Sequence, residues 1–246
     1  MRLMENILEF NVYGGDGTVS PRSVSVKKLC HGRHCGRDVN SVLEDLDKKR
    51  ALGYSVHGNP NVCRKSHYLL TNEDVIEVQG PQTSGEVELV AIMDGGEVLI
   101  SVGSDHNDRS LENMWTEVLG KVFDTAKSKQ MVPAVVAKDA WRYIDVRDHW
   151  DMLDLRSSVT IADERVPLQD FSLSALVDLE YHFAANPWLR EDGTVLFMGS
   201  SSILPTAHLE SYPGDFYFEV VDPMLNRKIS HHYAVQSIEE PGSLSL

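Results

Sequence analysis

The sequence predicts a β-rich α+β fold, and three observations support this prediction. Short segments with the apolar pattern of strands recur along the chain, with turn-forming residues between them. The clearest is a hairpin whose arms, 86–93 and 97–102, flank the turn sequence Asp94-Gly95-Gly96. Helical spacing occurs in only a few stretches. The chain has 246 residues and is 42% hydrophobic, which is enough for a sizeable core in one or two domains.

The predicted elements can be placed in order along the chain. Residues 7–30 form short strands around the turn at 13–17, and an amphipathic helix at 39–52 ends before Gly53. The hairpin arms follow these elements. The remaining predictions are strands at 75–78, 154–161, 195–198, 216–221 and 229–235, and helices at 111–126 and 172–184. Because the periodicity changes near residue 80, we expect a small N-terminal α/β cap region at 1–80 and a larger domain at 81–246.

Charge and cysteine content restrict the classes of partner and compartment. With 37 acidic and 23 basic residues, the net charge of −14 predicts repulsion of nucleic acid and of anionic membranes. The most basic stretch, 22–37, is short and is expected to be a solvated face. No apolar run approaches a membrane span, and the N-terminus lacks a signal-peptide pattern. The odd set Cys30, Cys35 and Cys63 favours a reducing compartment, so we expect a cytoplasmic protein.

Hairpin geometry predicts a cluster of carboxylates. Glu86 and Glu88 are two residues apart on one strand, so their side chains leave the same face. If Gly95-Gly96 forms the turn, Asp105 lies opposite Glu86, whereas an Asp94-Gly95 turn places Gly103 there. In either register three carboxylates gather at the open end of the hairpin.

Three close carboxylates need positive charge between them, and a hard divalent cation is the simplest source. Oxygen ligands favour Mg²⁺, Mn²⁺ or Ca²⁺ over zinc. Such an ion would keep positions open for chelation of a 2-oxo carboxylate or a 1,3-dicarbonyl. The alternative is a solvated hairpin edge, where acidic side chains prevent aggregation.

Several segments, in the same order, resemble the fumarylacetoacetate hydrolase superfamily. Residues 84–90 (Ser-Gly-Glu-Val-Glu-Leu-Val) look like its Glu-x-Glu metal strand, and 104–109 (Ser-Asp-His-Asn-Asp-Arg) resemble its segment with a metal-binding aspartate and a substrate arginine. Residues 127–133 resemble its lysine-containing segment. Residues 192–200 and 212–220 resemble its Gly-Thr loop and its closing Pro-Gly-Asp strand. The resemblance covers about residues 70–240 and is strongest to the DUF2848 branch.

The resemblance implies a mixed β-roll or sandwich with peripheral helices, and a homodimer. It also implies roles for individual residues. The expected metal ligands are Glu86, Glu88 and Asp105; the expected catalytic residues are Arg109, Lys129 and His106; and the expected substrate-binding residues are Arg109, Lys129, Gly199 and Ser200. Lys127 is the alternative to Lys129 if the alignment slips by two positions.

The sequence differs from the superfamily at the two positions whose side chains activate water in many members. Many members carry a histidine and a glutamate on the helix that follows a Gly-Arg motif, and here those positions hold Val42 and Asp45. Hydrolysis then needs another base, for which histidine is the usual choice near neutral pH. His106 follows Asp105 but faces the opposite side of a strand. The other candidates are histidines of the cap region, namely His31, His34, His57 and His67.

Two other motifs have ordinary structural interpretations. The segment 30–35 (Cys-His-Gly-Arg-His-Cys) contains four borderline metal ligands, but a single short loop closes poorly around tetrahedral zinc. Asp148, His149 and Asp151 suggest a catalytic triplet, yet they fit a loop that leads into the main domain.

The leading functional hypothesis is a divalent-metal-dependent hydrolase that cleaves a carbon–carbon bond in a small oxo acid, of the acylpyruvate or 1,3-dicarbonyl type. The first alternative is a decarboxylase, isomerase or lyase that uses the same site, because the water-activating pair is missing. The second is a non-catalytic binding protein that retains the fold.

Overall fold

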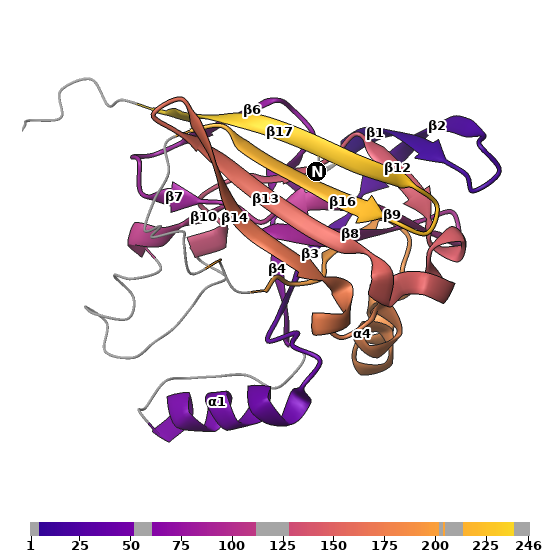
Figure 1. The fold of residues 1–246 in the computed structure, drawn as a ribbon, viewed down its shortest axis with the longest axis horizontal. Coiled ribbons are helices and arrows are strands. Elements are labelled where there is room, and N and C mark those ends of the chain that lie inside the picture. Colours follow the sequence, from indigo (N-terminus) through magenta and orange to yellow (C-terminus); the bar gives the residue numbers. More distant parts are fainter. Residues whose placement is uncertain (1–4, 52–60, 112–127, 202–203, 205–213, 239–246) are drawn as a thin grey trace, which may run out of the picture.

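The computed structural model describes residues 5–51, 61–111, 128–201, 204 and 214–238, and its described strands form two large sheets and one short pair (Figure 1). The ten-stranded sheet has the order β2-β1-β12-β9-β8-β15-β3-β4, with β11 paired to β9 and β5 paired to β11. Its strands are β1 (Asn6–Tyr13), β2 (Val19–Val26), β3 (Lys28–Arg33), β4 (Asn61–Lys65), β5 (Leu70–Thr71), β8 (Val87–Asp94), β9 (Glu97–Ser104), β11 (Ala134–Val136), β12 (Asp139–Arg142) and β15 (Thr194–Phe197).

The five-stranded sheet packs in front of the larger one in the view of Figure 1. Its order is β14 (Glu164–Ser172), β13 (Asp154–Ile161), β16 (Phe216–Asp222), β17 (Arg227–Ser237) and β6 (Val75–Val78). The short pair is β7 (Thr83–Ser84) and β10 (Asn107–Asp108). The described helices are α1 (Val39–Ala51), α4 (Leu179–Ala185) and five short 3₁₀ turns at His67–Leu69, Tyr143–Asp145, Arg147–Met152, Leu173–Ala175 and Pro187–Arg190.

Strand β8 is buried on both faces, and this explains its unbroken apolar run. Leu89 and Met93 belong to the core that also contains Phe218 of the five-stranded sheet. Val90 and Ile92 point to the opposite face, where a second core contains Phe10 and other residues of β1 and β2. The larger sheet therefore curls around one core while its other face packs on the smaller sheet. The β-rich fold class is confirmed.

Most predicted elements are present, and one helix needs correction. The predicted helix at 172–184 is wrong in its first half, because β14 extends to Ser172 and α4 begins only at Leu179. A 3₁₀ turn at Leu173–Ala175 follows β14, and the N–H of Val177 then donates to the carbonyl of Cys35 at 2.8 Å rather than within a helix. The carboxylate of Asp178 then accepts from the N–H of Tyr181 at 2.8 Å and caps α4. The predicted helix at 111–126 lies outside the described residues beyond Leu111.

The predicted boundary near residue 80 does not separate two sheets. Strands β1 to β4 come from the N-terminal part, yet they lie in the same sheet as β8, β9 and β15. Strand β15 pairs with both β8 and β3, and thereby joins the two parts of the chain. Helix α1 instead lies below the sheets and apart from them (Figure 1).

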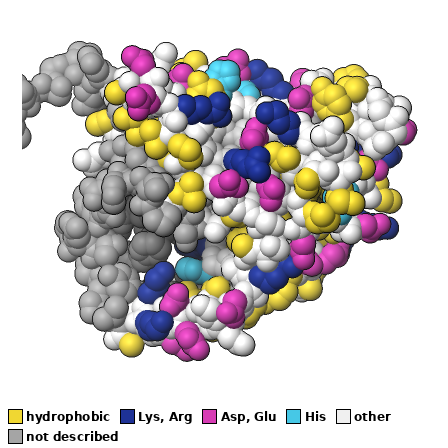
Figure 2. All heavy atoms as spheres, in the orientation of Figure 1, with side chains coloured by type: hydrophobic (Ala, Val, Ile, Leu, Met, Phe, Trp, Pro, Cys, Tyr) yellow, Lys and Arg dark blue, Asp and Glu magenta, His cyan; other side chains and the backbone are white. Residues whose placement is uncertain are grey.

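The outer face of the five-stranded sheet carries intermixed charges. Figure 2 shows basic and acidic side chains side by side on this face. Arg156 and Lys228, for example, both pair with Glu219. This arrangement fits the solvated side of an antiparallel sheet. Among the described helices, none has the length and apolar character that crossing a membrane requires.

Asp222, at the end of β16, is expected to make stability depend on acid pH. Its buried carboxylate lies 3.0 Å from both Arg227 Nε and His149 Nε2, and it accepts from the N–H groups of Met224 and Leu225. Burial alone would raise the pKa of Asp222, but these hydrogen bonds together lower it. A carboxyl whose folded-state pKa is lowered stabilises the fold above its ordinary pKa and loses this effect as the pH falls.

We therefore expect Asp222→Asn to lower the free energy of unfolding by about 2 kcal/mol at neutral pH. The difference from wild type should shrink as the pH falls towards about 3. Urea unfolding at neutral and acid pH measures both values. Asp170→Asn, on the exposed face of β14, is the matched control and should show little change. A cost for Asp222→Asn that does not vary with pH would contradict this account.

Candidate active site

The register of the β8–β9 hairpin places Glu86 opposite Asp105. Asp94 pairs with Glu97, so Gly95 and Gly96 form the turn, both with positive φ (60° and 80°). This is the two-glycine register that the sequence allows, and Gly suits the left-handed backbone. The N–H of Glu86 donates to the carbonyl of Asp105 at 3.1 Å, and the reverse bond is 2.9 Å. Of the two registers that the sequence left open, the structure therefore has the one in which Asp105 lies opposite Glu86.

A small pocket of about 220 Å³ opens at this end of the hairpin. Six of the predicted site residues line it, namely Glu86, Glu88, Arg109, Lys129, Gly199 and Ser200. Gly32, Arg33, His34, Cys35, Lys49 and Asn107 complete its described lining. The structure therefore brings together side chains from the hairpin, the loop after β15, the loop after β3 and helix α1. The alternative Lys127 lies outside the described residues.

Asp105 lies behind the pocket wall and is completely buried. Its Oδ2 accepts from the ammonium of Lys129, and its Oδ1 lies 3.3 Å from Nδ1 of His31. Burial opposes ionisation, but the neighbouring His31 and Lys129 hold the pKa of Asp105 well below its usual value. Burial also lowers the pKa of His31, so its imidazole is neutral near neutral pH. The ammonium of Lys129 thus lies against a carboxylate that the structure keeps ionised, and Lys65 adds a further positive charge nearby.

Glu88 is buried next to two other carboxylates. Its Oε2 accepts from the N–H of Gly199 at 2.7 Å. Burial, followed by the charge of Asp105, raises the pKa of Glu88 well above the usual value. Gly199 has φ of 95°, and a Cβ there would lie 2.9 Å from Sγ of Cys35. Glycine is therefore required at this position, both for the backbone conformation and for its close approach to Cys35.

Glu86 and Arg109 form the more accessible wall of the pocket. Nη2 of Arg109 donates to Oε1 of Glu86 at 2.6 Å, and its Nε donates to Oγ of Ser84 at 2.6 Å. These two bonds hold the guanidinium plane between strand β7 and the start of β8. The guanidinium of Arg109 therefore lies at the pocket in a fixed orientation.

The acidic residues present suit a hard divalent cation in ligand type, since all supply carboxylate oxygens. Oδ1 of Asp105 is buried and makes no hydrogen bond to a described group, and Oε2 of Glu88 is held by one backbone donor. These oxygens retain capacity for a cation. Within the described residues, however, no three acidic, histidine or cysteine side chains converge as a ready cluster. Two of the predicted ligands are paired with basic side chains: Asp105 with Lys129, and Glu86 with Arg109.

His106 points away from the pocket. Its Nδ1 lies 2.8 Å from the hydroxyl of Tyr233, which also contacts Oγ of Ser104 at 2.8 Å. Burial and the charge of Arg109 lower the pKa of His106 to about 3. As strand alternation implies, Asp105 and His106 face opposite sides. The described geometry gives His106 a packing role rather than contact with a ligand in the pocket.

Tyr233→Phe is expected to lower the free energy of unfolding by about 1–3 kcal/mol, because it leaves His106 and Ser104 without their buried partner. Ligand binding in the pocket should not change, since Tyr233 does not line it. Chemical unfolding and oxalate titration in the presence of Mg²⁺ measure the two effects. If Tyr233→Phe instead loses oxalate binding and keeps its stability, the contact between Tyr233 and His106 supports ligand binding and not the fold.

The structure adds residues that sequence analysis did not select for the site. Lys65 is buried, its Nζ has no described hydrogen-bond partner, and burial lowers its pKa to about 8. Gln169 accepts from the N–H of Val87 at 2.8 Å and donates to Oγ of Ser200 at 2.6 Å, which ties the loop after β15 to β8. Both lie on strands far from the hairpin in sequence, and no local motif marks them.

The other histidine and cysteine motifs do not form metal centres among the described residues. Cys30 and Cys35 are buried free thiols, and burial raises the pKa of Cys30 to about 12. His149 contacts Asp222, as described above, and this supports its structural interpretation. Of the four cap histidines, His34 lines the pocket, His31 contacts Asp105, His67 packs on Tyr68, and His57 lies outside the described residues.

Comparison with solved structures identifies the fold. A 2-keto-3-deoxy-D-arabinonate dehydratase complexed with magnesium and 2,5-dioxopentanoate is 12% identical, with a TM-score of 0.58 over 89% of this chain and 77% of that one. Cg1458 with inhibitor is 14% identical, with a TM-score of 0.59 over 94% and 89% of the two chains. Yeast ynq8, a fumarylacetoacetate hydrolase family protein, is 12% identical, with a TM-score of 0.56 over 88% and 95%.

At these identities the comparisons establish the fold alone. It is the fold of fumarylacetoacetate hydrolase family proteins, as the sequence motifs predict. No curated protein matches the chain. The sequence model of a family described as "Protein of unknown function (DUF2848)" matches residues 33–233, which include the hairpin and every described lining residue of the pocket except Gly32. The chain therefore belongs to the DUF2848 family.

Proposed function

We propose that this protein is a divalent-metal-dependent enzyme that acts on a small oxo acid, and that the pocket beside the β8–β9 hairpin is its active site. One observation supports this proposal above all. Six residues chosen from sequence resemblance, spread from Glu86 to Ser200, line one pocket in the structure. A solvated hairpin edge does not explain why Glu88, Asp105 and Lys129 are buried together.

In this proposal Glu86, Glu88 and Asp105 hold the cation. Mg²⁺ or Mn²⁺ suits these oxygen ligands, and Ca²⁺ is also compatible with them. When bound, the ion would act as a Lewis acid towards a chelated carbonyl of the substrate. A dehydratase of similar fold is complexed with magnesium and 2,5-dioxopentanoate, which is consistent with this choice.

Arg109 and Lys129 provide positive charge on the protein side of the pocket. Arg109 is oriented by Glu86 and Ser84, so its guanidinium can bind a substrate carboxylate in a fixed position. Lys129 is anchored on Asp105 and reaches the pocket wall. Enolate charge that develops on the substrate oxygen during bond cleavage would be stabilised by such fixed cations. Gly199, whose N–H donates to Glu88, and Ser200 also line the pocket.

Hydrolytic carbon–carbon cleavage of an acylpyruvate or 1,3-dicarbonyl acid is the first candidate reaction. It needs a group that takes a proton from water, and His34 is the described histidine that lines the pocket. The second candidate is decarboxylation, isomerisation or another lyase reaction. One observation favours it: Asp45, at the position of the superfamily's water-activating pair, is exposed and pairs with Lys48 at 2.9 Å.

Product analysis separates the two candidates. The purified protein would be incubated with Mg²⁺ or Mn²⁺ and either acetylpyruvate or oxaloacetate. Hydrolysis releases acetate and pyruvate from the first compound, whereas decarboxylation releases carbon dioxide and pyruvate from the second. We expect metal-dependent turnover that EDTA stops and excess Mg²⁺ restores. Turnover that resists EDTA, or that persists in Arg109→Met, would contradict the proposed site.

The assembly and domain organisation belong to this proposal as well. A homodimer and a functional division near residue 80 remain predictions from the sequence. Sedimentation velocity at several protein concentrations tests the first. The lining of the pocket by Arg33, His34 and Lys49 shows that the N-terminal part contributes directly to the candidate site.

A further inference from the structure

The described lining of the pocket carries an excess of positive charge. Of the described lining residues, Arg33, Lys49, Arg109 and Lys129 are basic, and Glu86 and Glu88 are acidic. The chain as a whole has the opposite balance, with 37 acidic and 23 basic residues. A basic pocket in an acidic protein attracts an anionic ligand locally while the remaining surface repels it.

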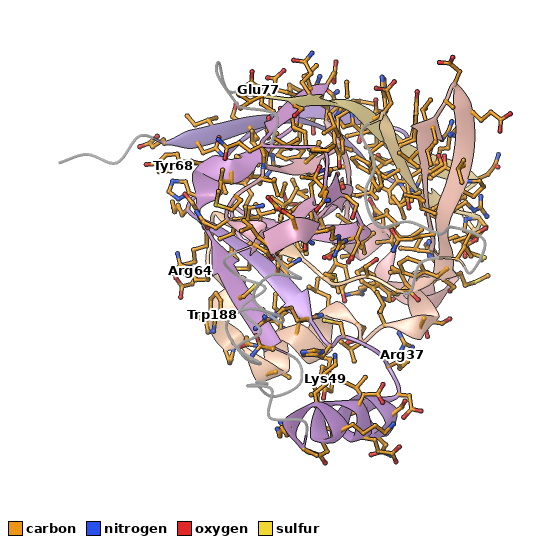
Figure 3. The ribbon with its side chains drawn as sticks, turned by 90° about the vertical axis from the view of Figure 1, so that its left-hand side faces the viewer. Arg37, Lys49, Arg64, Tyr68, Glu77 and Trp188 are labelled. Atoms are coloured by element: carbon orange, nitrogen blue, oxygen red, sulfur yellow. The ribbon has the colours of Figure 1, made fainter. Side chains whose placement is uncertain are left out.

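The four basic side chains divide into two groups. Arg109 and Lys129 are each paired with a carboxylate of the predicted metal site, so their positive charges are partly balanced there. Arg33 and Lys49 come from different elements, the end of strand β3 and helix α1. Lys49 forms no ion pair with a described acidic side chain, and it lies on the side of α1 that faces the strands (Figure 3).

Arg33 is held in position by strand pairing. It lies opposite Asn61 in the β3–β4 pair, and its Nη2 donates to Oδ1 of Asn61 at 2.8 Å. This bond orients the guanidinium at the pocket, and the amide of Asn61 itself carries no charge. Between Arg33 and α1, His34 adopts a left-handed backbone conformation with φ of 57°, and it also lines the pocket. Such a conformation is uncommon for residues other than glycine and is often found at ligand-binding loops.

Arg33 and Lys49 are close enough to His34 to affect its ionisation. Burial, followed by the charges of Lys49 and Arg33, lowers the pKa of His34 to about 4. Its imidazole is therefore neutral near neutral pH. The loop after β3 and helix α1 thus place two cations around one neutral ring at the pocket, on the side formed by the N-terminal part of the chain.

We propose that Arg33 and Lys49 bind a second carboxylate of the substrate, so that the enzyme prefers oxo acids with a carboxylate at each end. This inference rests on the proposed function, in which the hairpin carboxylates, Arg109 and Lys129 bind the oxo-acid end. A pocket of about 220 Å³ is smaller than typical drug-sized sites, so a short dicarboxylate fits its volume.

Calorimetric titration with a matched pair of ligands tests this inference. In the presence of Mg²⁺, 2-oxoglutarate and 2-oxopentanoate share the oxo-acid end and chain length, but only the first has a second carboxylate. Wild type should bind 2-oxoglutarate about tenfold more tightly than 2-oxopentanoate. Lys49→Gln should reduce this ratio to about threefold, since an exposed cation contributes less than a buried one. Arg33→Gln should reduce the ratio further, and Lys49→Arg should keep the wild-type value.

Lys48→Gln is the matched control, because it removes the same charge from the same helix while Lys48 pairs with Asp45 outside the pocket. Its ratio should equal that of wild type. Equal affinities for the two ligands in wild type, or equal ratios in Lys49→Gln and Lys48→Gln, would overturn the inference. Oxalate resembles only the oxo-acid end of the substrate and has no distant second carboxylate. It should therefore bind all these variants equally. If wild type does not bind oxalate with Mg²⁺, the proposed function fails; if it binds oxalate without preferring 2-oxoglutarate, only this inference fails.

Discussion

Replacing Glu88 by glutamine is expected to reduce turnover at least about a hundredfold, with an increase in the melting temperature of the metal-free protein. Glu88 is buried beside Asp105 and Glu86, so removing its charge relieves repulsion in a low-dielectric site. Glutamine can still accept the hydrogen bond from Gly199, and the loop after β15 should keep its position. The same substitution removes a carboxylate of the proposed cation site.

The combination of lower activity and higher stability distinguishes a functional carboxylate from a structural one. Initial rates on acetylpyruvate or oxaloacetate and a thermal melt with EDTA measure the two properties. Glu97→Gln, at the other end of the same hairpin, is a suitable control because Glu97 is exposed and pairs with Arg22. Its activity should match that of wild type. A Glu88→Gln variant with full turnover would exclude Glu88 from the site.

Replacing Lys129 by methionine is expected to lower the free energy of unfolding by about 3 kcal/mol, because it leaves the carboxylate of Asp105 buried without its cationic partner. Activity should also fall, since Lys129 lines the pocket. Urea unfolding in EDTA measures the stability change. Lys138→Met removes an exposed partner of Asp74 and should cost less than about 1 kcal/mol.

A second substitution tests the cause of this instability. The double variant Lys129→Met with Asp105→Asn removes the buried carboxylate that Lys129 pairs with, so it should recover a large part of the lost stability. The double variant should stay as inactive as Lys129→Met, because both proteins lack a predicted ligand-binding side chain. If the double variant is less stable than the single one by the full additive amount, the two residues do not form a coupled buried pair.

The hairpin could be predicted from sequence because its determinants are local. The turn Gly95-Gly96 sets the register, and the period of two places Glu86 and Glu88 on one face. The same local rule correctly places His106 on the face opposite Asp105, away from the pocket. The motif resemblance then identified Arg109 and Lys129, which the structure brings to the same pocket.

Other parts of the site depend on long-range pairing that the sequence does not reveal. His31 reaches Asp105 because β15 pairs in parallel with β3 and antiparallel with β8. Gln169 reaches Val87 from strand β14, which was not predicted because Pro167 and charged residues interrupt its alternation. Arg33 and Lys49 both line the pocket, although they come from a strand and a helix that are separated by the left-handed backbone at His34.

Thermal melting of wild type and Glu86→Ala tests the central claim that the hairpin pocket is a metal-dependent oxo-acid site. Each protein would be melted with Mg²⁺, Mn²⁺ or Ca²⁺, with and without oxalate, which mimics an enolate. A ligand that binds only the folded state raises the melting temperature. We expect oxalate to stabilise wild type only when a metal is present, and this shift to disappear in Glu86→Ala. No shift in wild type with any metal at millimolar concentration, or an equal shift in both proteins, would contradict the account.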